Sequence, residues 1–438
     1  MHKLVSKLIV YRNLPEDNLL QPLADVCAQV ESGSYNKEAV ISKIYDQIHR
    51  LLDIATVYGF NKNLWHNYLT YLLVSVETPF AITCEKEGAC EGSVNILVLN
   101  DFAVFQKLFA YDFAPLEKEL GITCFDIVTN YQAVSKKETR YNKNISEKVR
   151  RLSEALANAQ NAAAFYELVT AFYKAYGVGK LGLNKAFRLA QEGITAELVP
   201  IANTEAITFA DLVGYERQKQ ALRENTEAFV AGRPANNVLL FGDSGTGKSS
   251  SIKALINEYY DQGLRLIEIY KHQFQALSEI IAQIKSRNYR FVIYMDDLSF
   301  EEFETEYKYL KAVIEGGLEV RPDNILIYAT SNRSHLINET WKDRNDVTNE
   351  EGIYKSDTMQ EKLSLVNRFG CTIYYGQPDQ KEYFAIVSEL ARREGLEIPE
   401  EELHLEAKRF ELHHGGISGR TARQFINYMQ GIKKFAKK

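Results

Sequence analysis

The chain has 438 residues, of which 45% are hydrophobic and 25% are charged. At ~100–200 residues per domain, this length allows two to four domains. The composition excludes a mostly disordered chain, a collagen-like repeat and a small disulfide-stabilised scaffold. The formal net charge of -6 gives the chain no general attraction for nucleic acid, so nucleic acid is not indicated as a partner and only a local basic patch stays open.

The five cysteines favour a reducing compartment. They are odd in number and mostly scattered, and no second Cys/His pair completes a zinc site. The apolar patch at the N-terminus is too short for a signal peptide, and no stretch approaches the ~18 apolar residues of a membrane span. We therefore expect a cytoplasmic protein with no membrane association.

Residues 1–192 show helical periodicity but no chemical motif. Apolar residues recur at helical spacing from Phe165 to Tyr176, and Gly177 follows as a C-cap. The run Val94–Leu99 fits either a buried helix or a strand. The Tyr and Phe residues lack the interleaved Arg and Lys of a nucleic-acid stacking surface, which favours a place in the core. We predict a helical accessory domain over 1–192, of unknown task.

Residues 193–208 are predicted to be a linker, because periodicity weakens there and Pro200 interrupts the pattern. After it, short apolar runs alternate with helix-length segments. These runs are Val238–Phe241, Leu264–Tyr270, Phe291–Met295 and Asn324–Ala329. Such alternation predicts an α/β fold, a parallel sheet covered by helices on both faces.

The strongest motif directly follows the first of these strands. It reads Gly242-Asp243-Ser244-Gly245-Thr246-Gly247-Lys248-Ser249, the full GxxxxGK[ST] pattern between a strand and a helix. Glycines allow backbone N–H groups to surround a polyphosphate, and the helix N-terminus favours its negative charge. Lys248 would reach the β- and γ-phosphates, and Ser249 would bind Mg²⁺. The loop, extended to Ser250, predicts a nucleotide-binding site.

Two acids follow the strand Phe291–Met295. A buried strand with carboxylates only at its carboxyl end places them at the ligand-binding edge of the sheet. Asp296 is predicted to hold Mg²⁺, directly or through water, and Asp297 to polarise the attacking water. After Asn324–Ala329, we choose Asn332 over Thr330 and Ser331 as the side chain that orients this water or touches the γ-phosphate.

The order of these motifs resembles an AAA+ ATPase module, and several segments resemble a bacterial family of AAA+-related ATP-binding proteins of unknown function. The matching text includes NNVLLFGDSGTGKSS, FVIYMDDLSFEEFE and NILIYATSNRSHLI. The resemblance is firm over residues 206–438 and loose over the N-terminal half. It implies a P-loop NTPase domain over 209–375 and a small helical lid over 376–438.

The resemblance assigns further roles. Leu212, Val213 and Gly214 would lie beside the adenine. Arg368 matches the arginine finger that AAA+ rings donate to the γ-phosphate of a neighbouring subunit. Arg420, or as second choice Arg423, would be the lid sensor over the phosphates. Arg368 could instead be a helix-end arginine in a salt bridge, and Arg420 and Arg423 could each be a surface charge on a helix.

Two features depart from many AAA+ proteins. Asp297 stands where many have Glu, one methylene longer, so the rate of hydrolysis is open. No aromatic–apolar–Gly triplet follows Leu264–Tyr270, which argues against a protein that threads polypeptides.

These observations predict an Mg²⁺-dependent ATPase that couples ATP binding and hydrolysis to conformational change on an unknown macromolecular partner. The resemblance implies a homo-oligomer in the ATP-bound state. The alternative is an ATP-dependent switch or loader with little hydrolysis. A small-molecule kinase is a third reading, and it would leave the segments around Arg368 and Arg420 unexplained.

Overall fold

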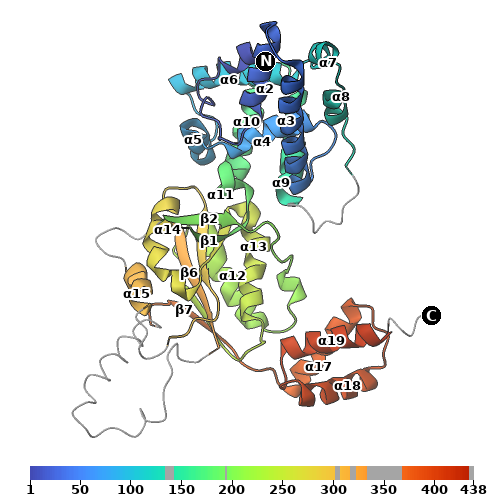
Figure 1. Ribbon diagram of the computed structural model, residues 1–438. Coiled ribbons are helices and arrows are strands. Elements are labelled where there is room, and N and C mark those ends of the chain that lie inside the picture. The colour runs from blue at the N-terminus through green and yellow to red at the C-terminus, as the bar shows by residue number, and fades with distance from the viewer. Residues whose placement is uncertain (134–142, 193–194, 301–305, 316–321, 333–366, 434–438) are drawn as a thin grey trace. The chain divides into compact units, whose positions relative to one another are not determined.

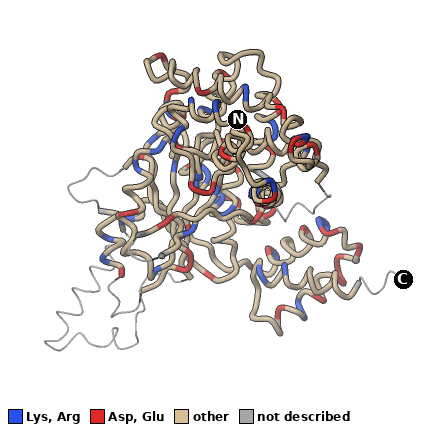
Figure 2. Tube along the Cα trace, turned by 45° about the horizontal axis from the view of Figure 1, so that its top comes forward, with Lys and Arg blue, Asp and Glu red and all other residues tan. Residues whose placement is uncertain are grey.

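The computed structural model of the chain describes residues 1–133, 143–192, 195–300, 306–315, 322–332 and 367–433 (Figure 1). The chain divides into two compact units, Met1–Asn184 with Pro200–Asn203, and Lys185–Val199 with Thr204–Lys438. We call them unit 1 and unit 2. Lys and Arg are interspersed with Asp and Glu along the described chain (Figure 2).

Unit 1 consists of helices, as the sequence predicted. They are α1 (His2–Val5), α2 (Leu20–Glu31), α3 (Lys37–Tyr58), α4 (Leu64–Ser75), α5 (Pro79–Glu87), α6 (Ser93–Phe109), α7 (Ala114–Leu120), α8 (Cys124–Thr129), α9 (Lys143–Ala157), α10 (Ala162–Tyr176) and α11 (Gly179–Leu183). Local sequence sets their ends. Asn161 caps α10 by accepting from Ala164 N, and Gly177, the predicted C-cap, follows with φ 78°.

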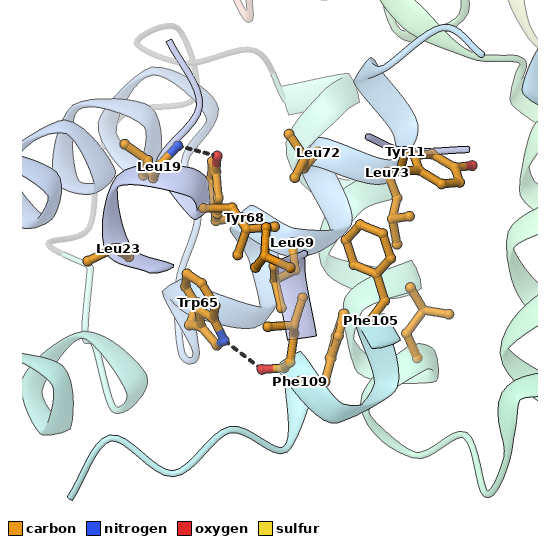
Figure 3. Packing of buried hydrophobic residues seen from close by; sticks show 14 of the residues in the cluster. Tyr11, Leu19, Leu23, Trp65, Tyr68, Leu69, Leu72, Leu73, Phe105 and Phe109 are labelled. Atoms are coloured by element: carbon orange, nitrogen blue, oxygen red, sulfur yellow. Dashed lines mark hydrogen bonds between the residues drawn. The ribbon is translucent and has the colours of Figure 1, made fainter. Parts of the chain in front are cut away.

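The core of unit 1 is rich in aromatic residues (Figure 3). Trp65 donates its indole N–H to Leu108 O at 2.8 Å, and the Tyr68 hydroxyl accepts from Leu19 N at 2.6 Å. Each buried polar tip thus has a partner. The run Val94–Leu99, which fitted a helix or a strand, belongs to helix α6, whose Phe102 and Phe105 are fully buried.

No single helix within the described ranges is long and apolar enough to cross a membrane. Helices α6 and α7 pass that test only as a pair, bent by 53°.

Unit 2 is built on a seven-stranded sheet of order β2-β1-β4-β5-β6-β3-β7. The strands are β1 (Ala186–Glu192), β2 (Thr195–Pro200), β3 (Val238–Gly242), β4 (Leu264–Glu268), β5 (Arg290–Met295), β6 (Ile325–Ser331) and β7 (Cys371–Tyr375). The neighbouring pairs β1/β4, β4/β5, β5/β6, β6/β3 and β3/β7 are all parallel. The four apolar runs identified in the sequence are confirmed as strands β3, β4, β5 and β6.

Helices cover the sheet, which confirms the predicted layers. Figure 1 shows α14 (Leu277–Ile284) and α15 (Tyr307–Glu315) on one side, and α12 (Glu216–Val230) and α13 (Lys248–Tyr259) on the other. After β7, helices α17 (Gln380–Arg393), α18 (Glu400–His413) and α19 (Gly419–Lys433) pack around a small core of their own that includes Tyr383, Val387 and Phe425. We call these three helices the lid.

The predicted boundaries before unit 2 need correction. Residues 186–192 lie in strand β1 of unit 2, not in the helical accessory domain, and residues 195–200 of the predicted linker form strand β2. Both strands alternate buried and outward residues, as in Phe187 and Arg188. Pro200 seemed to interrupt the pattern because it ends a strand at the edge of the sheet, where proline is tolerated.

Candidate nucleotide-binding site

The predicted phosphate loop connects β3 to α13, whose first residue is Lys248. Gly242, Gly245 and Gly247 all have positive φ, of 128°, 76° and 95°. Only glycine takes such angles at little cost, so the loop can turn its N–H groups inward. A side-chain carbon at Gly242 would collide with the carbonyl oxygen of Tyr375, on the neighbouring strand β7.

Lys248 is 5% exposed and lies within this loop. Its ammonium donates to Gly242 O at 2.9 Å and to Asp243 O at 2.5 Å. Burial lowers its pKa, while the carboxylates of Asp243, Asp297 and Asp296 counteract part of that effect. The loop therefore holds a partly desolvated cation where the helix N-terminus also favours negative charge.

The two predicted magnesium ligands lie side by side. Ser249 Oγ donates to Asp296 Oδ1 at 2.7 Å, and Thr330 Oγ1, from strand β6, donates to the same oxygen at 2.6 Å. Burial alone would raise the pKa of Asp296, but the hydrogen bonds from Thr330 and Ser249 help to lower it below its ordinary value. Asp296 is thus an ionised carboxylate near neutral pH.

Asp297 lies one residue beyond Asp296 and has a left-handed φ of 51°. Its Oδ1 accepts from Asn332 Nδ2 at 2.8 Å, and its N–H donates to Thr330 Oγ1 at 2.9 Å. The structure therefore brings together three predicted residues from two neighbouring strands, Asp296, Asp297 and Asn332, because β5 and β6 are parallel and end at one edge.

A cavity of about 780 Å³ opens over these groups. Gly245 to Ser250 line it, together with Asp296, Asp297 and Asn332. Leu212, Val213 and Gly214 line it too, next to the apolar lid residues Ile386 and Leu390. Its size falls in the range of ligand sites, ~300–1,000 Å³. One region of the cavity is apolar enough for a flat base, and the other is lined by the phosphate loop.

The two candidate lid arginines differ in their surroundings, although both line the cavity. The backbone N–H of Arg420 donates to Gly245 O at 3.2 Å, and its guanidinium lies 3.5 Å from Ser244 Oγ. Arg423 instead pairs with Glu394 of the lid at 2.9 Å. Arg420 is therefore the arginine that contacts the phosphate loop.

Arg368 lies apart from these residues. It precedes Cys371, which is paired with Val238 at the start of β3, whereas the phosphate loop follows Gly242 at the other end. Four residues of strand separate the two ends, roughly 13 Å at ~3.3 Å per residue. The structure thus does not bring Arg368 into the site of its own chain.

Several residues of the site are not predicted by the sequence. Thr330, which ranks below Asn332 in the prediction, contacts both acids through its hydroxyl. Lys219 is 5% exposed, lines the cavity and donates to Leu212 O at 2.8 Å. Ile386 and Leu390 form one face of the apolar region. No local pattern marks these residues, because their role depends on packing between segments far apart in the chain.

The donor set fits a nucleotide triphosphate with Mg²⁺. Hard oxygen ligands suit Mg²⁺, and Ser249 Oγ and the Asp296 carboxylate supply two of them beside the phosphate loop. At Gly247, the last glycine of the loop, an added side-chain carbon would have no atom within 4 Å, so the space beside the start of α13 is open. A P-loop after β3, acids after β5 and a polar end to β6 in one parallel sheet confirm the predicted AAA+-like P-loop NTPase fold.

Among solved structures, the Thermotoga maritima RuvB Holliday junction branch migration motor is 16% identical over 53% of this chain and 67% of that one, with a TM-score of 0.36. The FIGL-1 AAA domain in complex with ADP is 21% identical over 51% and 72%, with a TM-score of 0.35. No curated protein matches. Residues 183–433, more than half of the chain, match the family described as protein of unknown function DUF815, and the chain therefore belongs to that family.

Proposed function

We propose that the chain is an Mg²⁺-dependent ATPase of the AAA+ type. The observation that carries this proposal is the hydrogen bond of 2.7 Å from Ser249 to Asp296 beside the phosphate loop. Next to them, Asp297 accepts a hydrogen bond from Asn332. A site that only bound a phosphate group would need the loop but neither acid. ATP and ADP are the expected ligands, with the adenine beside Leu212, Val213 and Gly214.

The reaction is attack of water on the γ-phosphoryl group, which breaks its bond to the β,γ-bridging oxygen and yields ADP and phosphate. Asp297 orients the water and accepts its proton. Lys248 and Arg420 stabilise the phosphate charge from the loop and from the lid. Mg²⁺, held by Ser249 and Asp296, would neutralise charge on the phosphates. Loss of the γ-phosphate removes a partner of Arg420 and so shifts the lid.

A switch or loader with little hydrolysis is the second candidate. The Asp297 side chain is one methylene shorter than that of Glu, and its Oδ1 already accepts a hydrogen bond from Asn332. The attacking water would then be aligned by a carboxylate with one oxygen already hydrogen-bonded. In this version ATP binding alone would set the position of the lid, and a macromolecular partner would respond to it.

Assembly into a homo-oligomer in the ATP-bound state is part of the proposal. Arg368 lies beside the amino ends of β3 and β7, whereas the phosphate loop follows the carboxyl end of β3. From there it can reach only the γ-phosphate bound by another copy. The cytoplasm is the proposed location, which suits the five free cysteines.

The experiment that tests the function compares ATP binding and steady-state hydrolysis, with Mg²⁺, in the natural chain and three variants. Lys248→Ala should lose both activities. Asp297→Asn should bind ATP and lose roughly 10²-fold or more of the turnover. Lys408→Ala, at an exposed site on α18, is the control and should match the natural chain. Tight Mg²⁺-dependent binding without turnover in the natural chain would favour the switch, whereas no ATP binding would refute both candidates.

A further inference from the structure

Thr330 occupies an unusual place at the end of strand β6. Its side chain is 2% exposed, and its hydroxyl makes two hydrogen bonds to consecutive residues of another segment. It donates to Asp296 Oδ1 at 2.6 Å and accepts from Asp297 N at 2.9 Å. Its carbonyl oxygen also accepts from Leu298 N at 2.7 Å. One residue thus holds three successive residues after β5.

A hydroxyl is suited to this task because one oxygen both donates and accepts. The register between β5 and β6 ends at Met295 and Ala329, so the regular ladder no longer holds Asp296 and Asp297. Asp297 also adopts a left-handed φ of 51°, which a non-glycine residue keeps only when its surroundings stabilise it. The bond from its N–H to Thr330 supplies such a constraint.

The Asp296 carboxylate is held from two sides. Ser249 of the phosphate loop and Thr330 of β6 both donate to Oδ1. Ser249 belongs to the loop that contacts phosphate, while Thr330 belongs to a fully buried strand. Thr330 therefore fixes the Asp296 carboxylate relative to the buried strand β6. Asn332 is exposed and donates to the Asp297 side chain, not to Asp296 Oδ1 or Asp297 N, so it does not duplicate the contacts of Thr330.

We propose that Thr330 is a positioning residue of the ATPase site, which sets the carboxylate of Asp296 and the backbone of Asp297 together through one hydroxyl. Thr330 also lines the cavity, but its hydroxyl acts through these two acids. The inference rests on the proposed function, since it assigns Thr330 a role toward Mg²⁺ and the attacking water.

The test compares three substitutions in the full chain. Thr330→Val removes the hydroxyl at nearly constant volume, and Thr330→Ser restores it. Thr226→Val is the matched control, because Thr226 is also a buried threonine whose hydroxyl donates to Leu222 O and contacts the Tyr328 hydroxyl, in a different part of unit 2. Four quantities are measured: kcat, KM for ATP, the Mg²⁺ concentration needed to bind a fluorescent ATP analogue, and the thermal unfolding temperature.

Thr330→Val should lower kcat, or raise the Mg²⁺ requirement, by roughly 10–100-fold, as loss of a partner behind a metal ligand does. Binding of the analogue without Mg²⁺ should stay unchanged, because the phosphate loop is intact. Thr330→Ser should recover most of the loss. Thr226→Val should lower the unfolding temperature by a few degrees, as Thr330→Val does, but leave kcat and the Mg²⁺ requirement unchanged.

A Thr330→Val variant with natural kcat and natural Mg²⁺ requirement would overturn the proposal, and so would equal losses in Thr226→Val. If Thr330→Val does not fold, Thr330→Ala removes the same hydroxyl with less bulk and carries the same expectation. Should the natural chain bind Mg²⁺ and ATP without turnover, the Mg²⁺ measurement still decides the role of Thr330. Failure of the natural chain to bind ATP would instead refute the ATPase proposal on which this one rests.

Discussion

Lys248 shows how single residues prepare this site for phosphate. Its ammonium is buried within the phosphate loop and bonded to two carbonyl oxygens of that loop. Burial lowers its pKa even though three carboxylates favour the charged form. The cation has thus lost much of its water shell during folding, so a phosphate oxygen that approaches it does not need to displace that water.

Gly242 provides a test at the residue scale. Gly242→Ala would force a side-chain carbon against Tyr375 O at a φ of 128°, so nucleotide binding should be lost along with more than about 2 kcal/mol of stability. Gly263→Ala is the matched control, with a φ of 96° but no atom within 4 Å of the added carbon. It should lose only about 1–2 kcal/mol and bind ATP normally.

Denaturant unfolding and nucleotide titration measure the two effects. Equal ATP affinity in both glycine variants would show that the close approach of Gly242 to strand β7 has no part in shaping the loop.

At the scale of elements, the start of lid helix α19 lies directly against the phosphate loop. Arg420 N donates to Gly245 O, and a side-chain carbon on Gly245 would approach Ser418 Oγ at 3.0 Å and Arg420 Cβ at 3.1 Å. The loop and the lid therefore touch through backbone and short side chains. A change in the loop on binding or loss of phosphate would reach the lid through these contacts.

This contact distinguishes the two lid arginines. Arg420→Ala removes the guanidinium beside Ser244 and should weaken ATP binding or turnover by roughly tenfold or more. Arg423→Ala breaks an ion pair with Glu394, which keeps its hydrogen bond from Gln430. That pair is partly exposed and of small value, so the change should stay within about threefold.

Isothermal titration with ATP and a steady-state assay of both variants measure these effects. A larger loss in Arg423→Ala than in Arg420→Ala would reverse the assignment of the lid sensor.

At the scale of the whole molecule, the sheet of unit 2 separates two groups that the proposed reaction needs together. The phosphate loop follows the carboxyl end of β3, and Arg368 precedes the paired amino end of β7. Because the strands are parallel, these ends lie on opposite edges of one sheet. Under the proposed function, a complete site would therefore include Arg368 from a second copy.

Mixing two inactive variants tests this arrangement. Lys248→Ala cannot bind ATP but still presents Arg368, while Arg368→Ala binds ATP but should turn it over up to roughly 10³-fold more slowly. Mixed oligomers contain interfaces with both groups intact, so the mixture should regain part of the natural activity. Lys248→Ala mixed with Asp297→Asn is the control and should regain none, because both defects lie in the nucleotide-binding partner.

A mixture of Lys248→Ala and Arg368→Ala that stays inactive, although both variants co-assemble in gel filtration with ATP, would contradict a role for Arg368 between copies.

The sequence predicted strands and loops well where the information is local. The glycines, Lys248 and Ser249 have their role through spacing within eight residues, and an apolar run followed by Asp296 and Asp297 already indicates the edge of a sheet. The pattern was weaker at β2, which lies at the edge of the sheet, and at its neighbour β1, because short strands with alternating buried and exposed residues resemble a broken helix or a linker.

The sequence by itself determined the phosphate loop, the two acids after β5 and the class of the fold, since each depends on neighbours along the chain. Only the tertiary structure decided that Thr330 joins both acids, that Arg420 and not Arg423 contacts the loop, and that Arg368 lies at the far edge of the sheet. These outcomes depend on strand order, register and the packing of the lid, which bring together residues that are far apart in the chain.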